Sequence, residues 1–190
     1  KYLCVVDLGL DAVTLYPFTA AGNIDLEKAY VFKVEPAGSV PRHLVFNSRG
    51  DRAYLVTELG NTVIVLRYAA GRLEFMQLLP TLPADCRKDS KASAIRLSPD
   101  GHFLYASNRG YDSVAVYAVN PTDGTLEFRE LVESGGSSPR DINFLPGGKT
   151  FAAANEFSGR VAFFDFDAAT GKLTPSGRIA VMSRPLAIFW

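Results

Sequence analysis

Ionisable residues recur at one fixed place in this sequence, at the end of an apolar run. Successive members are 51, 51 and 47 residues apart: Asp7, Glu58, Arg109 and Glu156. A carboxylate in such a place can transfer protons, whereas a guanidinium can hold oxygen anions through two parallel hydrogen bonds. The recurrence therefore predicts a site that combines proton transfer with anion binding.

A second polar group opens the apolar runs that precede these positions. Its members are Arg42, His43, Arg140 and Asp141. In an antiparallel hairpin the start of one strand and the end of the next lie at the same rim, so both groups are expected together. Two interpretations stay open. The charges could pair structurally between repeats, Glu58 with Arg109 for example, or the arginines could clamp an anionic or carbonyl substrate while His43 and Glu58 transfer protons.

The elements that would position these residues are copies of one unit. First strands that enter a glycine-bearing turn align over 43–50, 94–101 and 141–148, and second strands align over 53–58, 104–109 and 151–156. A third and a fourth strand follow in each copy. Strands rich in Val, Tyr, Phe and Ala between turn residues are typical of an antiparallel meander, and radial stacking of meanders gives an all-β propeller. A two-sheet sandwich is the structural alternative.

The repeat predicts a single partial propeller domain of about four four-stranded blades. The units cover approximately 1–40, 41–91, 92–138 and 139–184, with 185–190 opening a closing blade. The first unit begins at its second strand, and an open arc would expose sheet faces and edges. We therefore expect the missing blades to come from N-terminal sequence outside this chain or from a second copy.

Composition excludes several classes of partner. The formal net charge is zero and the basic residues are scattered, which predicts no binding to nucleic acid or to an anionic membrane surface. No apolar stretch approaches the roughly 20 residues of a membrane span and no signal peptide is visible, which predicts a cytoplasmic location. Cys4 and Cys86 form no disulfide framework, and no cluster has metal-ligand spacing, so we expect reduced thiols and no metal.

The segment 135–139, Gly-Gly-Ser-Ser-Pro, is a further candidate for anion binding. Its backbone amides could cradle a phosphate, and it leads directly to Arg140. No helix follows it, as a P-loop would require, so ordinary loop structure is the competing interpretation.

The rim motifs together resemble the propeller-type lactonase family, which includes bacterial 6-phosphogluconolactonase and the fungal carboxy-muconate cyclases. The motifs include Pro-Arg-His-Leu-Val-Phe at 41–46, Ser-Pro-Asp-Gly at 98–101, Ser-Asn-Arg-Gly at 107–110 and Ala-Asn at 154–155. The resemblance extends through the whole chain. It implies a seven-bladed ring and hydrolysis of 6-phosphogluconolactone to 6-phosphogluconate, in the oxidative pentose phosphate pathway, without a cofactor.

The resemblance also implies roles for the rim residues. Glu58 or His43 would activate water, and Arg109 with Arg42 would stabilise the oxyanion or hold the phosphate. Four further residues are expected to contact the small anionic lactone or carboxylate substrate: Arg140, Asp141, Asp7 and Glu156. Two positions depart from the family pattern, because Ala94 replaces a common acidic residue and Glu156 a more usual Gln.

Two other functions stay open at this point. A carboxy-cis,cis-muconate lactonising enzyme would bind its substrate in the central funnel lined by the rim arginines, and it would use a proton donor such as His43. A non-catalytic propeller would serve as a binding scaffold, with its rim charges acting only as pairs between blades.

Overall fold

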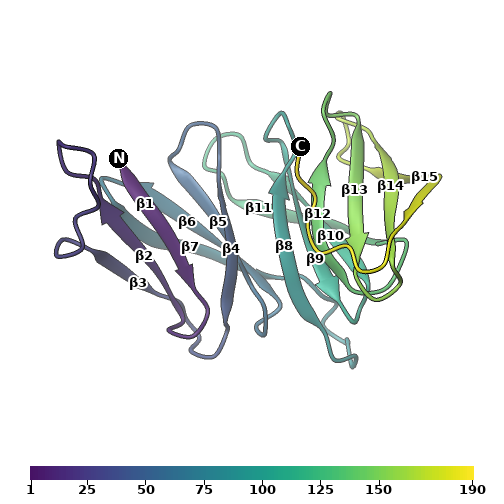
Figure 1. Ribbon diagram of the computed structural model, residues 1–190, viewed down its shortest axis with the longest axis horizontal. Coiled ribbons are helices and arrows are strands. Elements are labelled where there is room, and N and C mark those ends of the chain that lie inside the picture. The colour runs from purple at the N-terminus through teal and green to yellow at the C-terminus, as the bar shows by residue number, and fades with distance from the viewer.

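The computed structural model describes all 190 residues, which form four antiparallel sheets and no helix. Sheet 1 has three strands: β1 (Tyr2–Asp7), β2 (Ala12–Pro17) and β3 (Tyr30–Lys33). The four sheets stand side by side in an arc that runs from the N-terminus to the C-terminus (Figure 1). The chain contains no helix long and apolar enough to cross a membrane. The predicted all-β partial propeller is confirmed.

The other three sheets have four strands each. Sheet 2 comprises β4 (Pro41–Phe46), β5 (Arg52–Thr57), β6 (Thr62–Ala69) and β7 (Arg72–Pro80). Sheet 3 comprises β8 (Lys91–Leu97), β9 (Phe103–Arg109), β10 (Ser113–Val119) and β11 (Leu126–Glu133). Sheet 4 comprises β12 (Pro139–Phe144), β13 (Thr150–Asn155), β14 (Arg160–Phe166) and β15 (Leu173–Val181). Strand order follows chain order in every sheet, so each sheet is a meander.

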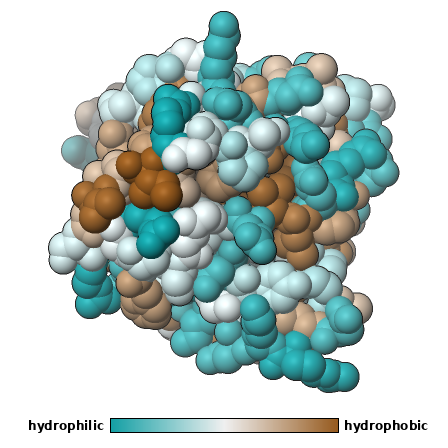
Figure 2. All heavy atoms as spheres, turned by 90° about the vertical axis from the view of Figure 1, so that its right-hand side faces the viewer, coloured by the Kyte–Doolittle hydropathy of each residue, from teal (hydrophilic) through white to brown (hydrophobic).

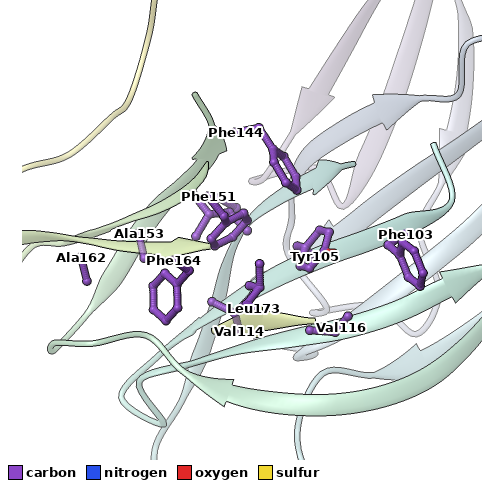
Figure 3. Packing of buried hydrophobic residues seen from close by; sticks show 12 residues of the cluster. Phe103, Tyr105, Val114, Val116, Phe144, Phe151, Ala153, Ala162, Phe164 and Leu173 are labelled. Carbon is purple, nitrogen blue, oxygen red and sulfur yellow. The ribbon is translucent and has the colours of Figure 1, made fainter. Parts of the chain in front are cut away.

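The core lies between neighbouring sheets rather than inside any one of them. Between sheets 3 and 4, the ring centroids of Tyr105 and Phe144 are 5.5 Å apart in edge-to-face geometry (Figure 3). Within sheet 4, the rings of Phe144 and Phe151 also meet edge to face, with centroids 5.2 Å apart. The buried Tyr105 hydroxyl donates a 2.7 Å hydrogen bond to the carbonyl of Gly171. Because both faces of these sheets are covered, their central strands are apolar on both sides of the alternation.

Two hairpin aspartates connect sheet 1 to sheet 2 and sheet 3 to sheet 4. Asp11 and Asp112 have φ angles of 45° and 60°, a left-handed conformation that Asp tolerates in turns. The Asp11 carboxylate accepts from the Val40 amide at 2.7 Å, and the Asp112 carboxylate accepts from the Ser138 amide at 2.7 Å. These bonds fix the two loops that lead directly into β4 and β12.

The segment 185–190 differs from the expected first strand. No neighbouring strand of the chain pairs with it, so it forms no ladder and crosses the inner edge of β12 instead (Figure 1). The Ile188 amide donates to Asp141 Oδ2 at 2.8 Å, and Asn143 Nδ2 donates to the Ile188 carbonyl at 3.0 Å. Two side chains of the innermost strand thus hold the segment in place.

The outer end of sheet 4 carries apolar side chains that face solvent. Figure 2 shows brown patches among polar atoms on this end of the molecule. Exposed residues of sheet 4 and the turn after it include Ile179, Val181 and Met182. A face of this kind suits packing against a further sheet, as expected for one end of an arc.

Candidate active site

The innermost strands of sheets 2, 3 and 4 each carry an irregularity at the rim end. The pairing of β4 with β5 skips Arg42, and the pairing of β12 with β13 skips Arg140. The pairing of β8 with β9 shifts between Ala92 and Ile95, which brackets Ser93. A β-bulge re-aims a side chain away from the regular alternation. The bulges therefore set the direction of Arg42 and Arg140 at equivalent places in two sheets.

Hydrogen bonds join the three irregular positions to one another. Arg42 Nη1 donates to the Ser93 carbonyl at 2.7 Å, and Ser93 Oγ donates to the Arg140 carbonyl at 2.8 Å. Ser93 is itself buried. A continuous chain of contacts thus crosses sheets 2, 3 and 4 along their innermost strands, and it fixes the distance between the arginines.

Glu58 lies between two of the arginines. Its Oε2 atom is 3.0 Å from Arg109 Nη2 and 3.4 Å from Arg42 Nε, and all three side chains are 16–18% exposed. The suggested pair of Glu58 with Arg109 is therefore present, with Arg42 as an additional partner. Burial lowers the pKa of Arg42, and repulsion from Arg109 and Arg140 lowers it further. Both contacts use Oε2, and Glu58 Oε1 accepts no hydrogen bond within the chain.

His43 is held as a neutral imidazole. Burial lowers its pKa from 6.5 to about 4, and the positive charges of Arg42, Arg96 and Arg140 act in the same direction. Arg42 Nη1 lies 3.2 Å from Nδ1 and 3.3 Å from Nε2 of the ring. At neutral pH this ring can accept a hydrogen bond, but it holds no second proton to donate.

The depressed His43 pKa predicts a pH-dependent stability. The unfolded chain binds a proton near pH 6.5 whereas the folded chain binds it near pH 4, so the free energy of unfolding should fall as the pH drops between these values. Thermal melts between pH 7 and about pH 4.5 should therefore show a smaller decline for His43→Gln. His102→Gln is the matched control, because the His102 side chain is 67% exposed. Equal declines in wild type and His43→Gln would contradict the assignment.

A cavity of about 580 Å³, called the channel hollow below, opens beside His43. The polar residues that line it are Arg42, His43, Arg96, Arg140 and Asp141. Sequence reasoning missed Arg96, although an arginine inside the apolar run of a first strand was a usable signal. Its Nη2 atom is 3.1 Å from Asp141 Oδ1.

Two residues predicted to contact the substrate, Asp141 and Asp7, have hydrogen-bond partners within the chain. The side chain of Asp141 is 5% exposed, and its oxygens are taken by Arg96 and by the Ile188 amide. Asp7 accepts a hydrogen bond from the Leu10 amide at 3.0 Å and lines neither the channel hollow nor the rim hollow described next. Asp141 therefore lies at the channel hollow, where it holds Arg96 and the Ile188 amide, whereas Asp7 lies outside both hollows.

A rim hollow of about 340 Å³ lies between sheets 3 and 4. Its ionisable lining residues are Asp89, Lys91, Arg109, Arg140, Glu156 and Arg184. Glu156 forms ion pairs with Arg140, at 3.3 Å, and with Arg184. Burial alone would raise the Glu156 pKa, but these two cations outweigh it and lower the pKa. Arg140 lines both hollows and so connects them.

The loop at 135–139 contributes in a different way from the expected phosphate cradle. The Ser137 amide donates to Ser158 Oγ at 2.9 Å, and the Ser138 amide donates to Asp112. These two amides are therefore not available to a ligand. The hydroxyl groups of Ser137 and Ser138 make no hydrogen bond within the chain, and both residues line the rim hollow.

Stacked four-stranded meanders with a charged inner rim define the chain as part of a β-propeller. Its sequence matches the family described as lactonase, 7-bladed β-propeller, over residues 1–190. The chain therefore belongs to this lactonase family. It is 39% identical over 176 residues to 6-phosphogluconolactonase of Bacillus subtilis, an alignment that covers 92% of this chain and 49% of the relative.

Solved structures agree with this placement. A protein from Lactobacillus plantarum superposes with a TM-score of 0.91 at 34% identity, covering 98% of this chain and 54% of that one. The periplasmic gluconolactonase of Pseudomonas aeruginosa superposes with a TM-score of 0.89 at 34% identity, covering 97% and 52%. The chain spans about half the length of these relatives.

Proposed function

We propose that the whole protein hydrolyses a sugar lactone, 6-phosphogluconolactone, to 6-phosphogluconate in the oxidative pentose phosphate pathway. The observation that carries this proposal is the Glu58 carboxylate, which two arginines hold through Oε2 while Oε1 stays free. Membership of the lactonase family and the relative named 6-phosphogluconolactonase support the choice of reaction and substrate. The substrate is a small anionic lactone, and no step needs a cofactor.

The proposed chemistry is an acyl transfer to water. Glu58 Oε1 accepts a proton from a water molecule, whose oxygen bonds to the lactone carbonyl carbon. The carbonyl oxygen becomes an oxyanion, which Arg109 and Arg42 stabilise through guanidinium N–H donors. The ring C–O bond then breaks, Glu58 returns the proton to the departing ring oxygen, and the new carboxylic acid releases its proton to solvent.

The neutral state of His43 weighs against the muconate alternative. Cyclisation would need a proton donor beside the substrate, and with a pKa of about 4 the His43 ring is not an imidazolium acid at neutral pH. In hydrolysis the same neutral ring can accept a hydrogen bond from the attacking water. His43 therefore takes the supporting role and Glu58 the role of base.

The scaffold alternative accounts for only part of the charge at the rim. Ion pairs between the blades are present, as that alternative requires. The two hollows nevertheless hold more cations than anions, with Arg42, Arg96, Arg109, Arg140 and Arg184 among their lining residues. An excess of arginine in a concave surface attracts an anion, and pairing alone does not require it.

The first test is an assay of lactone hydrolysis by the purified whole protein. We expect 6-phosphogluconolactone to disappear faster than in buffer alone, with saturation kinetics. A rate equal to the spontaneous one, under conditions where the Bacillus subtilis relative is active, would refute the proposal.

A cytoplasmic location is the one expected for an enzyme that acts on this substrate. It stays a prediction, since one structural relative is described as periplasmic.

A further inference from the structure

We propose that the rim hollow between sheets 3 and 4 binds the phosphate group of the substrate and thereby selects phosphorylated over unphosphorylated lactones. This inference rests on the proposed lactonase function and adds a specificity site to it. The hollow is separate from the Glu58 carboxylate, which is absent from its lining. Arg109 belongs to both places, because it contacts Glu58 and also lines the hollow.

Charge is the first argument for a phosphate. The lining contains four cations and two carboxylates, and the hollow keeps an excess of positive charge even when Arg109 is counted as paired with Glu58, which suits an anionic phosphate. One carboxylate, Glu156, is fully used in holding Arg140 and Arg184. The side chain of Glu156 is 7% exposed, and its two ion pairs hold the guanidinium groups of Arg140 and Arg184 at the edges of the hollow.

Available donors are the second argument. The Lys91 ammonium group forms no ion pair or hydrogen bond in the chain, although it lines the hollow at the first residue of β8. The hydroxyls of Ser137 and Ser138 are likewise free to donate. Arg184 uses Nη2 for Glu156 and retains its other N–H groups. Phosphate oxygens accept several charge-assisted hydrogen bonds at once, which suits a mixed set of Lys, Arg and Ser donors.

Geometry is the third argument. In a sugar δ-lactone with a 6-phosphate, the ring oxygen joins the carbonyl carbon to the ring carbon that carries the phosphorylated CH₂ group. When the carbonyl carbon of such a ligand approaches Glu58, its phosphate therefore lies beyond the ring oxygen, away from the reacting carbon. Arg109 extends from Glu58 to the rim hollow, and its buried Nε atom has no partner in the chain. The same arginine can thus border both the reacting carbonyl and the phosphate.

The test compares two lactones that differ only in the phosphate. For the whole protein, Lys91→Gln and Arg184→Gln should each raise the KM for 6-phosphogluconolactone by about 10- to 100-fold, the range of a lost charge-assisted hydrogen bond, with little change in kcat. The KM for glucono-δ-lactone should stay within about twofold of wild type, because that substrate places no phosphate in the hollow. Arg178→Gln is the matched control, since Arg178 is a 60% exposed arginine on β15 outside both hollows.

A binding measurement separates failure of this inference from failure of the lactonase proposal. 6-Phosphogluconate should raise the wild-type melting temperature more than gluconate does, and the difference should vanish in Lys91→Gln and Arg184→Gln. If lactone is hydrolysed but both variants keep wild-type KM values, the phosphate site is wrong and the lactonase stands. If neither lactone is hydrolysed but 6-phosphogluconate binds in a Lys91-dependent manner, the phosphate site stands and the reaction is wrong.

Discussion

Glu58→Gln should lower kcat for lactone hydrolysis by roughly 10²- to 10⁴-fold, the contribution expected from one general base. The replacement has nearly the same shape, and its carbonyl oxygen can still accept from Arg42 and Arg109. Its amide cannot take a proton from water. The KM should change much less than kcat, because the lost interaction belongs to the transition state. Steady-state kinetics on the whole protein measure both quantities.

Folding provides the necessary second readout for Glu58→Gln. Removal of the carboxylate charge leaves two largely buried guanidinium groups without their counter-ion, and we expect a loss of about 1 to 3 kcal/mol in unfolding free energy. Glu133→Gln is the matched control, because Glu133 is exposed at the end of β11 and forms no ion pair. A variant that melts lower but keeps the wild-type kcat would remove Glu58 from the chemistry and make its pairing purely structural.

The repeat was readable from the sequence because the apolar positions coincide from copy to copy. Second strands such as β9 are buried on both faces, so their residues are almost all apolar or small, and this composition indicates the fold rather than a site. The charges that end these strands were visible for the same reason, as departures from a regular pattern. The sequence pattern therefore predicts that Glu58 and Arg109 lie together, and their ion pair confirms that prediction.

The direction of side chains could not be predicted in the same way. A bulge adds one residue without a sequence signature, so the skipped position at Arg42 appears only in the strand register. Asp141 is the second example. The sequence places it beside Arg140 at the rim, yet its oxygens serve Arg96 and the Ile188 amide. Contacts between distant segments decide which rim charges remain available to a ligand.

Arg109→Met should lower kcat/KM by roughly 10²- to 10³-fold, the loss expected when one oxyanion donor is removed. Methionine preserves much of the apolar stem of Arg109, so packing between sheets 2 and 3 should survive. The carboxylate of Glu58 is not left alone, because Arg42 Nε still lies 3.4 Å away. The unfolding free energy should therefore fall by only about 1 kcal/mol.

This unequal response separates an active site from a scaffold. If the rim charges only paired the blades, Arg109→Met would cost stability and no substrate would be found. If Arg109 stabilises the oxyanion, activity falls while the melting temperature is nearly kept, whereas Arg49→Met, at a 55% exposed arginine in the turn between β4 and β5, changes neither. Combining Arg109→Met with Glu58→Gln gives the sharpest criterion. Residues that act on one transition state are strongly non-additive, so the double variant should be little slower than the worse single variant.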